Sequence, residues 1–199
     1  MNQIFNASFF YSIKYGIIEL YKRVYMDLES ILTSDNIEEE IRYNEDYIFS
    51  LIPELKYEVG FDQKHPHHSL DVWNHTIEAL KHIESNFELR LIVLLHDIGK
   101  PFSYQDGEDG VRHFKGHAKK SREISEGILT RLNIEPKEEI LYVIENHDTP
   151  IDTNTIKNRE LEIKRLKVQY ADAYAHSPST IQNRILRLNT IKELIWFII

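Results

Sequence analysis

The spacing of apolar residues between chain breakers constrains the fold more than any other feature of this sequence. Only 7 glycines and 6 prolines occur among 199 residues. Most of them separate segments in which apolar residues recur every three or four positions. This periodicity is typical of amphipathic helices that bury one face. The sequence therefore predicts an all-α protein, with no internal repeat and no glycine-rich phosphate loop.

The same pattern predicts where the helices lie. We expect a first helix over residues 7–32 and a second that begins near Asp35 or Asn36. After a polar segment at 60–69, further helices are expected over residues 72–83, 89–98, 117–132, 136–146, 159–176 and 178–199. Gly99 is predicted to end the 89–98 helix in a left-handed conformation, and Pro101 prevents its continuation. Residues 104–110, rich in aspartate and glycine, are predicted to form a loop.

Charge and composition limit the partners and the chemistry. The chain has 32 acidic and 24 basic residues and a formal charge of -8, so its surface as a whole repels nucleic acid. RNA binding would need a local basic track, for which the candidates are Lys115, Lys119, Lys120, Arg122 and Arg131; a solvated helix face is the simpler interpretation. The absence of cysteine excludes thiol nucleophiles and thiolate ligands, which leaves imidazole and carboxylate to bind metals.

Neither end of the sequence has the pattern of a membrane segment. The first 25 residues lack a basic start, a continuous apolar run and a cleavage site of small residues. The apolar end, IKELIWFII, is too short to cross a bilayer. We therefore expect a cytoplasmic protein without membrane contact, whose last helix packs onto the core; a homodimer contact through an exposed tail is the alternative.

The segment LIVLLHDIGK, residues 91–100, carries the strongest chemical signal. An apolar helix ends there in His96 and Asp97, two adjacent residues of metal-ligand type. A buried, unpaired carboxylate beside an imidazole is costly, so we expect a divalent cation to compensate it. A hydrogen bond between the two side chains at a capped helix end is the alternative.

Further residues of ligand type fall in other predicted helices. Taken singly, His75 is a candidate core histidine, His147 a helix-terminal residue favoured by the helix dipole, and Asp172 a capped or salt-bridged acid. His117 opens a helix. With residues 96 and 97, they give the order His, His-Asp, His, His, Asp across five successive predicted helices.

This order resembles the HD-domain superfamily of metal-dependent phosphohydrolases. The segments GFDQKHPHHSLDVWNHT, LLHDIGKPFSY, RHFKGHAKKS, ENHD and ADAYAHSP are similar to the HD domain of bacterial CCA-adding tRNA nucleotidyltransferases and poly(A) polymerases, over about residues 51–179. The nucleotidyltransferase head of those enzymes has no counterpart in residues 1–50. We therefore expect an HD-domain helical bundle over residues 51–199 with a helical appendage over 1–50, and we set aside nucleotide addition to tRNA.

The resemblance implies one or two divalent ions. In the single-metal form, His75, His96, Asp97 and Asp172 hold one ion. In the two-metal form, Asp97 bridges the ions, and His117 and His147 complete the second site. A ligand set of imidazoles and carboxylates suits Mn, Fe, Co, Ni or Zn better than Mg, which is the alternative.

Four residues are expected to take part in catalysis. Asp97 and Asp172 hold the ions that activate water, and Asp172 could also orient that water. Lys100 follows His96 by one helical turn and is expected to neutralise a phosphate oxygen, or else to complement the helix end. His113 is expected to protonate a leaving oxygen or to bind substrate.

Other polar residues are expected near the site. Arg112 is a candidate for substrate binding, with a surface role as the alternative. His176 is expected to share a helix face with Asp172 and to support the ligands. His65, His67 and His68 are expected to lie in a loop that lines the entrance.

Three functions fit these features. The leading one is hydrolysis of a phosphoester or phosphoanhydride in a small nucleotide. The second is a phosphodiesterase or phosphatase acting on an RNA or tRNA end. The third, a non-catalytic sensor that binds metal or nucleotide, is disfavoured because a scaffold has no physical need for six metal-type side chains in this order.

Overall fold

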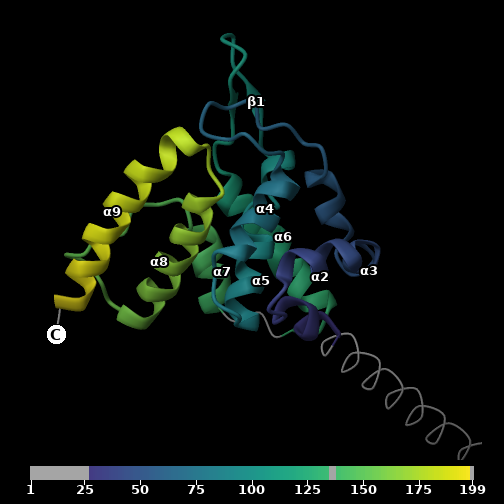
Figure 1. Cartoon of the computed structure of the whole chain (residues 1–199), viewed down its shortest axis with the longest axis horizontal. Coiled ribbons are helices and arrows are strands. Elements are labelled where there is room, and N and C mark those ends of the chain that lie inside the picture. The colour runs from purple at the N-terminus through teal and green to yellow at the C-terminus, as the bar shows by residue number, and fades with distance from the viewer. Residues whose placement is uncertain (1–26, 135–137, 198–199) are drawn as a thin grey trace, which may run out of the picture.

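The protein is described by a computed structural model that covers residues 27–134 and 138–197. Within these ranges the regular secondary structure is helical apart from one short hairpin (Figure 1), which confirms the predicted all-α class. Residues 7–26 of the first expected helix lie outside the described ranges, whereas residues 27–32 are helical. No helix in the described ranges combines the length and the apolar character needed to cross a bilayer.

Most of the elements follow one another with short connections, and the two longest irregular segments span residues 59–71 and 146–158. They are α2 (Ile37–Tyr43), α3 (Glu45–Leu51), the 3-10 helix η1 (Pro53–Glu58), α4 (Val72–Lys81), α5 (Phe87–Leu95), the 3-10 helix η2 (Lys100–Phe102), β1 (Gln105–Asp106), β2 (Arg112–His113), α6 (His117–Arg131), α7 (Glu138–Glu145), α8 (Arg159–Tyr174) and α9 (Pro178–Phe197).

Side-chain caps explain where three of the helices begin. Asp71, Asn86 and Asn158 each accept a hydrogen bond from the backbone amide three residues later, at 2.7, 3.0 and 3.1 Å. Such caps satisfy an amide that has no partner inside the helix, and each stabilises by about 1 kcal/mol. They start α4, α5 and α8, which carry or lead to several of the expected ligands.

The sequence pattern missed the shortest elements. α3 and η1 span seven and six residues, too few for a clear helical period. The segment predicted as a loop contains β1, which pairs antiparallel with β2 so that Gln105 faces His113. Two-residue strands cannot show the alternation that identifies a strand.

One hydrophobic core joins most of the helices. Buried residues from the segment 28–55 and from α4 to α8 form a single cluster. Trp73 of α4 lies in it, and its indole nitrogen donates to Glu45 of α3 at 2.7 Å. The boundary that we placed between residues 50 and 51 stays a prediction, since α2 and α3 share this core with the helices that follow.

A second, smaller cluster fixes the last helix. α9 packs beside α8 (Figure 1), through buried residues of α9 that include Leu188, Ile191 and Ile195. Leu186 and Leu194 of α9 are exposed. The packing of the last helix agrees with expectation, and a homodimer contact there stays a prediction.

Gly99 does not have the left-handed conformation that we predicted. Its φ and ψ angles are -80° and -16°. A Cβ at this position would collide with the carbonyl oxygen of His117 and would lie 2.5 Å from the amide nitrogen of Ser121. The Gly99 amide donates to the Ser121 hydroxyl at 2.9 Å. The prediction was wrong because the glycine permits close contact between two chain segments and does not form a left-handed cap of α5, whose C-cap is His96.

Candidate metal centre

The structure brings all the side chains expected to bind metal into one place. They are His75 of α4, His96 and Asp97 after α5, His117 at the start of α6, His147 after α7 and Asp172 of α8. Two groups with ligand atoms within 4.8 Å of one another share Asp97: one with His75, His96 and Asp172, and one with His117 and His147. Side chains in or directly after α4, α6, α7 and α8 thus meet, from distant parts of the chain, around Asp97 or the histidine beside it.

The two oxygens of Asp97 face different histidines. Oδ2 lies 3.2 Å from Nε2 of His96 and 3.5 Å from Nε2 of His75. Oδ1 lies 3.3 Å from Nε2 of His117 and 3.5 Å from Nε2 of His147. This is the arrangement that a carboxylate needs in order to bridge two cations.

Backbone carbonyls orient the four imidazoles. Nδ1 of His96, His117 and His147 lies 2.6, 2.8 and 2.7 Å from the carbonyl oxygen three residues earlier. Nδ1 of His75 lies 3.1 Å from the carbonyl oxygen of Ala175. A carbonyl only accepts, so each Nδ1 carries the proton and, in the neutral ring, each Nε2 presents a lone pair to the centre.

These lone pairs fit a divalent cation. Nε2 of His117 and Nε2 of His147 face each other at 3.3 Å, an unfavourable contact for two neutral rings protonated at Nδ1. Nε2 of His96 and both oxygens of Asp97 are buried without a hydrogen-bond partner among the described residues. Cations at the two groups would satisfy all of these atoms, because each lone pair is directed inward.

Two basic side chains, His96 and Lys100, lie beside Asp97. The ammonium of Lys100 is buried 2.6 Å from Oδ2 of Asp97, as an ion pair without hydrogen-bond alignment, and donates to Gln63 at 2.8 Å. Burial opposes ionisation of Asp97, yet His96 and Lys100 hold its pKa well below the usual value. Burial likewise disfavours the imidazolium of His96, but Asp97 and Asp172 outweigh it and raise that pKa to about 10. A bound cation would take the place of this proton.

Asp172 is held from both sides. Its Oδ1 lies 3.0 Å from Nε2 of His75, and its Oδ2 accepts from Arg184 of α9 at 3.0 Å. Despite burial, His176 and His75 keep the pKa of Asp172 well below the usual value. Nδ1 of His176 donates to the Asp172 carbonyl oxygen at 2.7 Å, so the two residues lie together as expected. They do not share a helix face, because α8 ends at Tyr174, before His176.

A third group of histidines was missed at the sequence level. Ligand-type atoms of His68, His75 and His176 lie within 4.8 Å of one another. Burial lowers the pKa of His68 and of His176, the latter to about 4. Nδ1 of His68 is buried without a hydrogen-bond partner in the described chain. The motif HPHHS was the available signal, but helical periodicity does not determine the path of an irregular segment.

A cavity of about 240 Å³ lies beside the centre. It is lined by His65, His67, His68, Asp97, Lys100, Arg112, His113, Phe114, His117, His147, Asp148, Asp172, His176 and Arg184. The expected entrance histidines and the three expected substrate-binding residues are therefore all at its wall. Asp148, which the sequence analysis did not single out, lies there with Oδ2 3.9 Å from Nε2 of His117.

Arg112 has structural contacts as well as a place at this cavity. Its guanidinium donates to Asp106 and to the carbonyl oxygen of Asp62, both at 2.7 Å. It also lies over the rings of Phe61 and Tyr104, at 4.8 and 4.4 Å from their centroids. These contacts hold the β1–β2 hairpin to the preceding loop. The substrate-binding roles of Lys100, Arg112 and His113 stay predictions.

Comparison with known proteins finds relatives for part of the chain. This chain is 39% identical over 89 residues to the A-adding tRNA nucleotidyltransferase of Deinococcus radiodurans, and the match covers 42% of this chain and 20% of the relative. It is 41% identical over 93 residues to the CC-adding tRNA nucleotidyltransferase of Thermus thermophilus, covering 44% and 21%. The chain thus spans about a fifth of the length of these curated relatives.

A family comparison covers more of the chain. The model of the HD domain matches residues 67–177, more than half of the sequence. This range contains every side chain of the two groups that share Asp97. The match confirms the resemblance drawn from the sequence, and the chain belongs to the HD domain family.

Proposed function

We propose that the protein is a two-metal phosphohydrolase that cleaves a phosphoester of a small nucleotide. The HD domain belongs to a superfamily of metal-dependent phosphohydrolases. The observation that carries the proposal is the position of Asp97, whose two oxygens face two separate histidine groups. The nitrogen-rich ligand set favours Mn, Fe, Co, Ni or Zn.

In this proposal the chain holds the ions and orients the reactants. When bound, two divalent ions supply the Lewis acidity that activates water and stabilises charge on the phosphoryl oxygens. Asp97 and the four histidines hold them, with the imidazoles oriented by backbone carbonyls. Arg184 fixes one oxygen of Asp172, which leaves the other directed at the centre to bind an ion and to orient the attacking water.

Two further side chains have proposed roles at the cavity wall. The ammonium of Lys100 pairs with Asp97 in the structure. When bound cations balance the charge of Asp97, this ammonium becomes available to neutralise a phosphate oxygen. His113 is exposed at the same wall, where an imidazole can donate a proton to the leaving oxygen.

Charge distribution supports a small substrate. Of the five basic residues that could guide RNA, Lys120, Arg122 and Arg131 each pair with a glutamate, at 3.1, 3.0 and 2.8 Å. These pairs weaken a cationic track on a protein whose net charge is -8. The names of the two relatives, which refer to tRNA, supply the case for the alternative, an RNA-end phosphodiesterase or phosphatase.

The test combines metal analysis with a substrate screen. The purified protein is assayed for bound metal and, with added Mn²⁺, for hydrolysis of cyclic nucleotides, mononucleotides, dinucleotides and RNA oligonucleotides with phosphorylated ends. We expect His96→Ala and Asp97→Ala to lose metal and to reduce turnover by about a hundredfold or more. His82→Ala is the matched control, because His82 pairs with Glu78 and stacks on Tyr174 away from the centre.

The outcomes separate the candidate functions. Near-normal turnover in both ligand variants would refute the assigned centre. Metal binding without turnover of any phosphoester would support the sensor, and faster turnover of RNA ends than of nucleotides would support the RNA-directed enzyme.

A further inference from the structure

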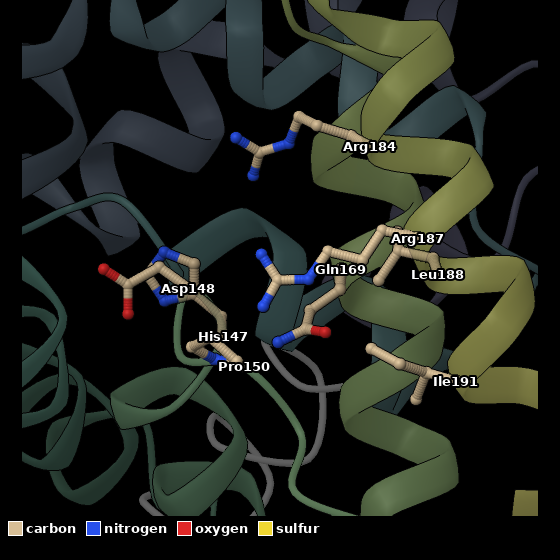
Figure 2. A pocket seen from close by; sticks show the side chains of 8 residues that line it. All are labelled: His147, Asp148, Pro150, Gln169, Arg184, Arg187, Leu188 and Ile191. Atoms are coloured by element: carbon tan, nitrogen blue, oxygen red, sulfur yellow. The ribbon is translucent and has the colours of Figure 1, made fainter. Parts of the chain in front are cut away.

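A second pocket adjoins the metal centre on the side of α9 (Figure 2). It has a volume of about 180 Å³, and its lining includes His147, Asp148, Gln169, Arg184 and Arg187. Three of these residues, His147, Asp148 and Arg184, also line the larger cavity. The two spaces are therefore neighbours, and they meet beside the histidines of the second metal group.

This pocket depends on a part of the chain outside the family match. The match ends at residue 177, whereas α9 begins at Pro178 and contributes four of the lining residues. Leu188 and Ile191 are buried in the cluster between α8 and α9, which fixes the rotation of α9. Membership in the HD domain family therefore does not account for the pocket.

Two arginines of α9 point into it. Arg184 and Arg187 are three residues apart and so share one face of the helix. Figure 2 shows both guanidinium groups extending from α9 toward the side where His147 and Asp148 lie. Arg184 donates to Oδ2 of Asp172 at 3.0 Å. Arg187 is exposed and forms no hydrogen bond or ion pair with the described residues.

Asp148 also lines the pocket, and in Figure 2 its carboxylate points away from the two arginines. Oδ2 of Asp148 lies 3.9 Å from Nε2 of His117, so its carboxylate is directed to the metal side. The segment that carries His147, Asp148 and Pro150 is held to α8, because Gln169 and Arg165 of that helix both donate to the carbonyl oxygen of Thr149, at 2.7 and 2.6 Å. Arg184 is paired with Asp172, so the positive charge that the pocket offers without a partner among the described residues is that of Arg187.

We propose that this pocket binds a second phosphate group of the substrate while the scissile phosphate lies at the metal centre. The inference rests on the proposed function and names its substrate class, a nucleotide with two separate phosphates such as a nucleoside bisphosphate. The forked N–H donors of arginine match phosphate oxygens. A volume of about 180 Å³ is below the roughly 300–1,000 Å³ of pockets that enclose a whole small molecule, so it suits one substituent.

Binding is tested first without turnover. Calorimetric titration of the full chain, stripped of metal with a chelator, compares adenosine 3′,5′-bisphosphate, inorganic pyrophosphate and adenosine 5′-monophosphate. In the metal-free protein we expect Arg187→Ala to weaken the binding of the bisphosphate by about tenfold. Arg187→Lys should restore it only in part, because it keeps the charge without the fork. Lys192→Ala, an exposed cation of α9 outside the pocket, is the matched control.

Turnover is tested second, with added Mn²⁺. Arg187→Ala should lower kcat/KM for the bisphosphate relative to the monophosphate by about tenfold. Equal effects on both substrates, or a bisphosphate affinity that does not depend on Arg187, would overturn the inference. If no phosphoester is hydrolysed but Arg187-dependent binding persists, the proposed hydrolase fails and the phosphate pocket stands. An RNA oligonucleotide that carries the same two phosphates at its end is titrated in parallel. Whichever binds more tightly, the RNA end or the free nucleotide, is the ligand that the pocket serves.

Discussion

Replacing Gly99 with alanine would test whether close packing of two chain segments builds the metal centre. Gly99 follows Asp97 by two residues and lies against the first turn of α6, which carries His117. A methyl group there would collide with the carbonyl oxygen of His117 and lie 2.5 Å from the amide nitrogen of Ser121. Backbone atoms cannot rotate away as a flexible side chain can, so we expect the two segments to separate.

The cost follows from two contributions. Overpacking at a rigid contact costs about 1–3 kcal/mol. Loss of the hydrogen bond from the Gly99 amide to the Ser121 hydroxyl adds about 1 kcal/mol. For a protein of this size each kcal/mol lowers the melting temperature by about 2–4 °C, so the expected fall is roughly 4–16 °C. Because the separation moves Asp97 away from His117, we also expect fewer bound metal ions per chain.

Gly127→Ala is the matched control. Gly127 is exposed within α6, and a Cβ there would meet nothing within 4 Å. The same substitution should therefore stabilise the protein, by about 0.5–1 kcal/mol, because alanine is the better helix former. Thermal melts of the two variants and metal analysis provide the measurement. A Gly99→Ala protein that is as stable as the wild type and binds as much metal would refute this reasoning.

Two further predictions concern buried charged groups around the centre. Lys100→Met removes the cation beside Asp97 and should destabilise the metal-free protein by about 3–5 kcal/mol; Mn²⁺ should then raise the melting temperature of this variant more than that of the wild type, and an equal rise would contradict the role of Lys100 as the counterion. Burial, with Asp97 nearby, raises the pKa of Glu58 from 4.5 to about 8; the folded state then holds a proton that the unfolded state has lost, so stability falls as pH rises from 4.5 to about 8. Glu58→Gln should accordingly change the stability of the metal-free protein more favourably at pH 8 than at pH 5. Thermal melts that show the same effect of the substitution at both pH values would contradict this.

The sequence determined the longer helices and the identity of the ligand-type side chains, because both have local signals. The period of apolar residues and the caps at Asp71, Asn86 and Asn158 depend on neighbours only a few positions away. His96 and Asp97 were conspicuous because two polar residues end an apolar helix. The order of the other candidates along the chain led to the family resemblance, which then supplied their roles as metal ligands.

Only the tertiary structure decided how these parts meet. Gly99 is required by contact with α6, 22 residues away at Ser121, and no local rule distinguishes that need from a left-handed cap. The meeting of His68 with His176 and the pocket formed by Arg187 depend on an irregular segment and on the rotation of α9 against α8. Packing between distant segments sets these positions, and packing depends on the shape of the whole core, which periodicity along the chain does not encode.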